Sequence, residues 1–228
     1  MKIGVANALF ATYLLSGCAS RSPFTSAEML RLADPPAAPS IVASEWISAR
    51  KGVEWTLGTA SGSRLVIRCV ESTTTRAMTL HRFTMERDGK PWREEVLGVG
   101  RTGLWLVSMA KAGGPRMRLD PPMPLSTGVP SPGAEIDWVG NIRIGSESMA
   151  AQGYSAVFDE SHWANSNSGK PVVGLDTVLE LLPARGEAIP FPVTRWYEAG
   201  TGLVHLRLGV DGEVRDYAKT EHPAESRP

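Results

Sequence analysis

The sequence predicts an all-β protein, an antiparallel meander of curved sheets that forms a sandwich or a half-barrel with short helices or none. The chain has 23 glycines and 17 prolines among 228 residues, which is typical of a turn-rich β protein. Asp-Gly pairs at residues 88–89 and 211–212 lie between short apolar runs, and this dipeptide is the strongest short hairpin signal. Because the runs follow one another as hairpins, they favour antiparallel pairing over βαβ units.

Residues 1–17 have the layout of a lipoprotein signal peptide. A charged start precedes an apolar run, Ile3 to Leu15, that is too short for a transmembrane helix of about 20 residues. An ordinary cleaved signal peptide is expected to end in Ala-x-Ala, whereas this one ends in Leu15-Ser16-Gly17 before Cys18. A buried core segment is a further alternative, but it rarely combines these three features.

Leu15-Ser16-Gly17-Cys18 resembles the lipobox of bacterial lipoproteins. The resemblance implies transfer of a diacylglyceryl group to the Cys18 thiol, cleavage before Cys18, and N-acylation. One acyl chain binds a membrane with only about 10⁴ M⁻¹, whereas two or three anchor a protein stably. Ala19 follows the cysteine. By resemblance to the sorting rule of enteric bacteria, this residue favours the outer membrane, facing the periplasm.

Residues 18–44 are predicted to be a lipidated, flexible tether rich in Ser, Pro and Ala. Within it, residues 26–33 fit a two-turn helix capped by Ser26. A flexible chain of this length spans about 25–30 Å, so the tether is expected to hold the folded body away from the membrane.

Residues 45–220 are predicted to form a single β domain, followed by a disordered tail at 221–228. The expected strands are residues 53–59, 64–70, 77–86, 92–99, 104–109, 204–208 and 214–217. Two similar halves, 45–119 and 133–220, are joined by a proline-rich crossover at 120–133. Each half is small for a separate domain, and the alternative is a chance likeness among glycine-rich turns.

Alternation along the strands predicts which side chains share a face. In the strand at 204–208, one face is formed by three apolar residues: Val204, Leu206 and Leu208. Both faces of 104–109 are apolar, so this strand is central in a sandwich or lines a cavity. In 77–86 the apolar residues change sides between Leu80 and Phe83, which predicts a bulge or a bend.

Spaced glycines and aromatics in the body resemble those of TapB-like and other uncharacterised bacterial envelope proteins. The segment from Tyr197 to Val204 is similar to their Tyr-x-x-Gly-x-Gly-Leu-Val, and Gly52 to Trp55 to their Gly-x-x-Trp. Pro124 to Trp138 resembles their central Pro…Gly…Trp, whereas His205 replaces a basic residue usual in the group. The resemblance implies an all-β, curved-sheet envelope protein and no catalytic residues.

The charge balance argues against nucleic acid as a partner, and the cysteine content argues against an intramolecular disulfide. Loss of residues 1–17 removes one lysine, leaving 23 basic against 24 acidic side chains, so nucleic acid is not an expected partner. Once Cys18 is acylated, Cys69 is a solitary thiol and forms no intramolecular disulfide. In an apolar strand, its simplest role is that of a small buried hydrophobe.

The chain has no serine-hydrolase elbow, zinc-protease helix, phosphate loop or Cys-x-x-Cys pair, so no cofactor or metal is predicted. Only the segment around Asp159, Glu160 and His162 groups carboxylates with an imidazole. Three interpretations stay open for it: a solvated loop, ligands for a cation, or the catalytic residues of a hydrolase.

The aromatic residues allow two interpretations. Five tryptophans lie in or at the start of expected strands and are most simply core residues: Trp46, Trp55, Trp105, Trp138 and Trp196. Alternatively, an apolar cavity that takes an acyl chain is lined by Trp105 with three methionines, Met78, Met85 and Met109.

These features lead to one principal interpretation and two alternatives. The protein is expected to be a non-enzymatic, lipid-anchored envelope module that binds a protein partner or an apolar ligand. The alternatives are a carrier of lipid or lipoprotein acyl chains in a hydrophobic cavity, and a hydrolase that uses the 159–162 segment.

Overall fold

In the part of the chain that the structure describes, twelve antiparallel strands form a closed barrel, in which each strand lies beside its neighbours in the chain and β1 pairs with β12. The computed structural model describes residues 44–76, 78–128, 132–159, 170, 172–210 and 213–219. The predicted all-β antiparallel meander is confirmed, and the barrel that it forms is closed. Among the described residues no helix is long and apolar enough to cross a membrane.

The elements follow one another in chain order, and their bounds are these: α3 (Ser44–Ile47), β1 (Glu54–Gly58), β2 (Arg64–Thr74), β3 (Met78–Arg87), β4 (Lys90–Gly100), β5 (Gly103–Lys111), β6 (Met117–Thr127), β7 (Glu135–Ile144), β8 (Glu147–Asp159), β9 (Val172–Leu182), β10 (Ile189–Glu198), β11 (Gly202–Val210) and β12 (Glu213–Lys219).

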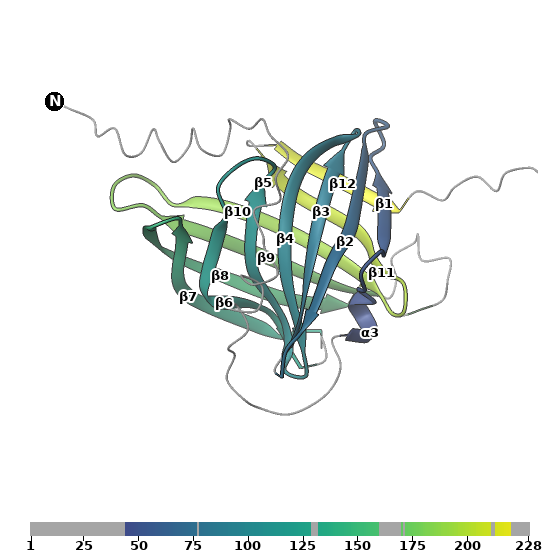
Figure 1. Ribbon diagram of the computed structural model, residues 1–228, viewed down its shortest axis with the longest axis horizontal. Coiled ribbons are helices and arrows are strands. Elements are labelled where there is room, and N and C mark those ends of the chain that lie inside the picture. The colour runs from purple at the N-terminus through teal and green to yellow at the C-terminus, as the bar shows by residue number, and fades with distance from the viewer. Residues whose placement is uncertain are drawn as a thin grey trace, which may run out of the picture.

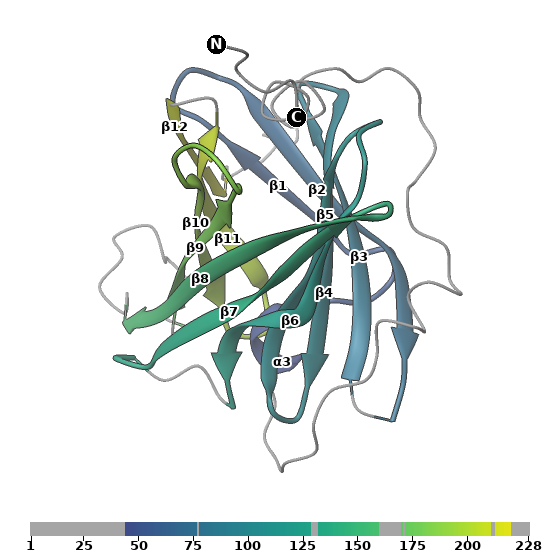
Figure 2. The same ribbon diagram turned by 90° about the vertical axis from the view of Figure 1, so that its left-hand side faces the viewer.

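The barrel is flattened, so that its two walls pack on each other. Strands β7 and β8 run at a steep angle to β3 and β4 when the molecule is viewed from the side (Figure 2). Eight strands enclose just enough space for side chains, and sixteen leave a water-filled channel, so a twelve-stranded barrel must flatten to fill its lumen. Buried residues of nearly all strands, among them Leu57, Phe83 and Leu206, accordingly belong to one apolar core.

The hydrogen-bonded ladder is shortest at two places, where β1 meets β12 and where β6 meets β7. Between β6 and β7 only Arg118, Leu119 and Asp120 are paired. Three prolines follow in β6, and proline cannot donate to a ladder. Beyond that point Trp138 of β7 bridges the gap, because its indole N–H donates to the carbonyl of Pro121 at 3.1 Å.

The proline-rich segment thus differs from its prediction. Residues 120–133 were expected to be a crossover, but residues 120–127 belong to β6, which still pairs with β5 on its other side. The expected halves, 45–119 and 133–220, therefore share one continuous sheet, and their mutual similarity stays a prediction.

Two predictions about single strands are also corrected, a bulge in β3 and the apolar face of β11. In β3 the apolar residues lie on two faces as expected, with Met78 and Leu80 in one cluster and Phe83 and Met85 in the main core. The strand pairs without interruption from Met78 to Met85, so the expected bulge is not in it and both faces are buried instead. The extra residues lie in neighbouring strands, at Val70 of β2 and Trp92 of β4. In β11 a bulge at Val204 turns this side chain away from Leu206, and it joins Trp196 in a separate apolar cluster.

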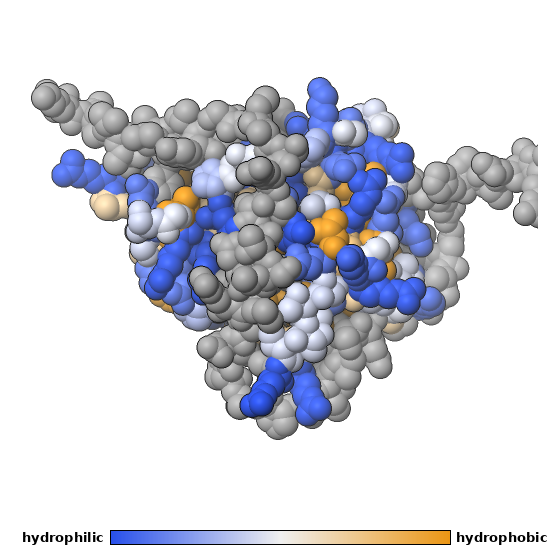
Figure 3. Space-filling view, in the orientation of Figure 1, coloured by the Kyte–Doolittle hydropathy of each residue, from blue (hydrophilic) through white to orange (hydrophobic). Residues whose placement is uncertain are grey.

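The outer face of β1–β4 carries paired charges around a small apolar area (Figure 3). Arg68 lies between Glu54 and Glu86, at 2.6 and 2.7 Å. In the next row Arg82 contacts Glu71 at 3.2 Å. Beside these pairs, a second apolar cluster on β3–β5 comprises Met78, Leu80, Val96 and Val107, with Trp105 packed against it.

Helix α3 lies at one end of the barrel, called here the closed end (Figure 1). It contacts β10 and β11, and Ile47 is buried in the main core with Trp46 packed beside it. At the same end the indole N–H of Trp55 donates to the carbonyl of Thr201 at 3.3 Å. The β1–β2, β3–β4 and β5–β6 turns lie at the opposite end, called here the mouth.

Candidate ligand-binding site

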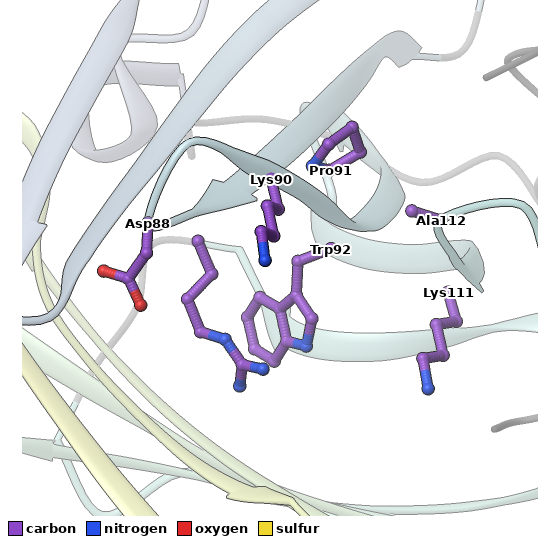
Figure 4. Close-up of a pocket in the computed structure, with 7 residues that line it drawn as sticks. Asp88, Lys90, Pro91, Trp92, Lys111 and Ala112 are labelled. Atoms are coloured by element: carbon purple, nitrogen blue, oxygen red, sulfur yellow. The ribbon is translucent and has the colours of Figure 1, made fainter. Parts of the chain in front are cut away.

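A pocket of about 460 Å³ opens at the mouth, between the β3–β4 turn and the end of β5 (Figure 4). Its lining comprises seven residues: Arg87, Asp88, Lys90, Pro91, Trp92, Lys111 and Ala112. Three of the seven are cationic and one is a tryptophan, so the pocket combines positive charge with one large aromatic surface.

The Asp-Gly turn that the sequence predicts positions one side of this pocket. Asp88 and Gly89 have φ angles of 50° and 75°, as the tight turns of β-hairpins require. The Asp88 carboxylate accepts hydrogen bonds from the Arg64 backbone N–H at 2.7 Å and from the Ser63 hydroxyl at 2.8 Å. These bonds hold the pKa of Asp88 below its usual value. They also tie the β3–β4 turn to the β1–β2 turn.

Trp92 forms the aromatic side of the pocket because it is an extra residue in β4. The pairing of β3 with β4 passes from Met85–Arg93 to Glu86–Pro91, which leaves Trp92 unopposed in a bulge. Its side chain packs on the edge of the main core. The Arg87 guanidinium lies 5.3 Å from the centroid of the indole ring, within the range of a cation–π contact.

Lys90 and Lys111 flank the Trp92 indole in the close-up view (Figure 4). Lys90 is exposed and Lys111 is half-buried. Neither lysine makes an ion pair with another residue in the described part of the chain. Both ammonium groups are therefore free to meet an anion that enters the mouth.

Cationic side chains continue from the mouth into the lumen. Lys111 is paired in register with Arg93, and Met109 with Glu95, so these side chains point inward at successive levels. Arg93 contacts Glu95 at 2.7 Å, and its Nη2 lies 3.0 Å from the sulfur of Met109. From the opposite wall, Arg195 of β10 donates from Nη2 to both Glu95 oxygens, at 3.0 and 3.1 Å.

This internal cluster has two guanidinium groups and one carboxylate, so it keeps a net positive charge. The side chains of Glu95 and Arg195 are only 2% and 3% exposed. Burial favours the neutral carboxyl, but the charges of Arg195 and Arg93 outweigh it and lower the pKa of Glu95. Arg93 Nε and Arg195 Nη1 are buried and have no hydrogen-bond partner in the described part of the chain.

A buried group near the closed end joins Cys69, Ser72 and His81, but its chemistry does not favour catalysis. Ser72 Oγ lies 2.9 Å from His81 Nδ1, and Cys69 Sγ lies 3.9 Å from the same nitrogen. Burial lowers the pKa of His81 to about 4 and raises the pKa of the Cys69 thiol. The imidazole is thus uncharged at pH 7 and the thiol protonated, so neither group is activated for nucleophilic attack.

Most of the residues singled out in the sequence for chemistry fall outside the described part of the chain. Cys18 lies among residues 1–43, and Glu160 and His162 lie in the stretch after β8. Asp159 is the last residue of β8, and its side chain is not described. The lipid anchor and the 159–162 segment therefore stay predictions. Among the residues that are described, no group of three metal-ligating side chains occurs.

The four residues of the predicted acyl-chain cavity are divided between two clusters. Met85 and Met109 lie in the main core inside the barrel. Met78 and Trp105 belong to the second cluster, on the opposite face of β3–β5. Met78 packs directly over the backbone of that face, since a Cβ on Gly98 would lie 2.5 Å from its sulfur.

The residues that shape the mouth were not singled out in the sequence. One signal was present, because the segment from Arg87 to Arg93 surrounds a tryptophan with three basic residues next to a predicted turn. The contact of Glu95 with Arg195 left no such local signal, since 100 positions separate the two residues.

No protein-family model and no curated protein matches the chain. Among solved structures, a predicted exported protein with a YmcC-like fold from Bacteroides fragilis is 15% identical, with a TM-score of 0.42, over 76% of this chain and 96% of that one. A predicted lipoprotein from Parabacteroides distasonis is 12% identical, with a TM-score of 0.35, over 74% and 92% of the two chains.

Proposed function

We propose that the protein is a lipid-anchored envelope protein that binds a ligand at the mouth of its barrel, without catalysing a reaction. The observation that carries the binding role is the pocket at the mouth, which opens between two hairpin turns while α3 packs against the other end. A packed core fills the lumen below it, so the ligand is held at the mouth and not along the barrel axis.

The anchor is the second part of the proposal. The lipobox places the lipid on Cys18, and residues 18–44 connect it to α3 at the closed end. With about 28 Å of flexible reach, the tether leaves the mouth accessible from the periplasm. Ala19 supports anchoring in the outer membrane.

A Cys18→Ser variant tests the anchor. The wild-type chain is expected in the membrane fraction after washes at high salt, with outer-membrane markers, and the variant in the soluble periplasmic fraction. If the variant stays with the membrane at high salt, the lipid is not what holds the protein there.

Filling the pocket tests the binding role. Ala112 lines the pocket, so Ala112→Trp is expected to occupy it, whereas Ala60→Trp adds the same side chain at an exposed turn. The proteins are purified from the native host without denaturation, and their intact masses are measured under native conditions. A bound mass shared by the wild type and Ala60→Trp, and lost in Ala112→Trp, supports the proposal. A mass that all three retain places the ligand elsewhere, and no bound mass in the wild type contradicts the binding role.

A further inference from the structure

We propose that the mouth pocket is selective for an oxyanion, a phosphate or carboxylate group, carried by a ligand whose apolar part lies against Trp92. This inference rests on the proposed function and adds the chemistry of the ligand. Its basis is the arrangement of charge around one aromatic ring.

The rim of the pocket offers three cations to an entering anion. Arg87, Lys90 and Lys111 come from the end of β3, the start of β4 and the end of β5. Among the described residues that line the pocket, the single carboxylate is that of Asp88, and Ser63 and Arg64 engage both of its oxygens. Lys90 and Lys111 make no ion pair in the described part of the chain, so their positively charged ammonium groups are the hydrogen-bond donors that an anion can reach at the rim.

The lumen below the rim reinforces this potential. Arg93 is the inward neighbour of Lys111, and Arg195 lies one level deeper, where both guanidinium groups contact the Glu95 carboxylate. A positive charge in low-dielectric surroundings acts over a longer distance than an exposed one. An anion at the mouth therefore faces net positive charge on the rim and beneath it.

Trp92 provides the surface that the apolar part of the ligand would contact. A bulge places its indole in the pocket wall, and a guanidinium already lies over the ring. Aromatic walls favour ligands with a flat apolar surface. The pocket thus fits an anionic group joined to an apolar or ring-containing part, a chemistry that both soluble metabolites and lipid headgroups present.

The test uses defined probes and titration calorimetry at low ionic strength. Phenyl phosphate and benzoate carry an oxyanion on a ring, and benzyl alcohol carries the ring alone. The wild type is expected to bind phenyl phosphate or benzoate at least tenfold more tightly than benzyl alcohol, with an affinity that falls as salt is added. Equal affinity for all three overturns the proposal.

Removing the two lysine charges tests whether the oxyanion binds in this pocket. The double variant Lys90→Gln/Lys111→Gln is expected to lose at least tenfold in affinity for the oxyanion probes, and Trp92→Phe a smaller amount. Lys51→Gln, an exposed lysine near the closed end, is the matched control and is expected to bind as the wild type does. Circular dichroism checks that each variant is folded. An unchanged affinity in the folded double variant contradicts the proposal.

Vesicles separate the two sources of the anion. If the ligand is a lipid headgroup, Cys18→Ser protein is expected to sediment with phosphatidylglycerol vesicles but not with phosphatidylcholine vesicles, and this difference disappears in the double variant. If it is a soluble molecule, only the small probes bind. Failure of every anionic probe, while Ala112→Trp still removes a native bound mass, overturns the anion chemistry and leaves the mouth as the binding site.

Discussion

Glu95 and Arg195 lie on opposite walls of the barrel and meet in its lumen, where Arg195 Nη2 is 3.0 and 3.1 Å from the two carboxylate oxygens. Strands β4 and β10 are separated by five strands on either side of the closed barrel, so this contact is a direct tie across it. Arg93, from the same strand as Glu95, completes the cluster. The ion pair between Glu95 and Arg195 therefore connects the two opposite walls of the flattened barrel.

Glu95→Gln is expected to destabilise the protein strongly. The substitution leaves two buried guanidinium groups without a compensating charge, and breaking a buried pair in this way costs about 3–5 kcal/mol. Glu54→Gln is the control, because its ion pair with Arg68 is about 40% exposed on both sides and is worth less than about 1 kcal/mol. Urea unfolding of the two variants at pH 7 measures the difference, and equal losses contradict a structural role for the cluster.

Local patterns in the sequence predicted β1–β5, β11 and β12, whereas β6–β10 were not among the expected strands. The Asp-Gly at 88–89 correctly placed the β3–β4 hairpin. Closure of the barrel had no such signal, because the pairing of β1 with β12 depends on residues more than 150 positions apart. Prolines in the 120–133 segment indicated a crossover, because proline is excluded from a strand that is paired on both edges. The sequence has no local signal that one edge of β6 is unpaired along its prolines, which is what allows them to lie in a strand.

The candidate site was less predictable than the fold. Alternation correctly assigned Met78 and Met85 to opposite faces of one strand. The cavity hypothesis nevertheless grouped the two residues, because it depended on residue type alone, and the structure places them in separate clusters. Lys111 and Arg93 become neighbours only through the register of two strands, which bulges alter. The lipobox is different in kind, because its signal is contained in four consecutive residues, Leu15 to Cys18.

Acid is expected to destabilise the protein partly through His81. Its pKa is about 4 in the fold, well below the ordinary 6.5, so the unfolded chain takes up this proton first. The contribution to the free energy of unfolding is complete above pH 6.5. It falls as the pH drops from 6.5 to 4, by about 3 kcal/mol in all.

His81→Asn isolates this effect, because asparagine does not titrate and still offers a polar partner to Ser72. Urea midpoints measured between pH 4.5 and 7 are expected to vary less with pH in the variant than in the wild type. The same slope in both proteins excludes His81 as the source of the acid sensitivity.

Cys69 is expected to be chemically inert in the folded protein. Its side chain is 1% exposed, and burial raises the pKa of the thiol, so little thiolate is available and reagents reach it only after local opening. In Cys18→Ser protein, Ellman's reagent should react at least about 100-fold more slowly without denaturant than in urea. Adding Ser61→Cys at the exposed β1–β2 turn should introduce one fast thiol; a fast reaction without it contradicts the burial of Cys69.

Gly103 is expected to be the glycine least tolerant of a side chain, because its backbone conformation and its surroundings both exclude one. Its φ is +136°, and a Cβ would lie 2.0 Å from the carbonyl oxygen of Ser126 in β6, a backbone atom that cannot turn aside. Gly145 in the β7–β8 turn also has a positive φ, +60°, but a Cβ there meets nothing. Gly145→Ala should therefore cost only the left-handed penalty of about 1–2 kcal/mol, whereas Gly103→Ala must displace β6 from β5 and cost several kcal/mol more. Thermal unfolding of the two variants compares them directly, and similar midpoints would show that β6 moves away at little cost along its weakly paired edge.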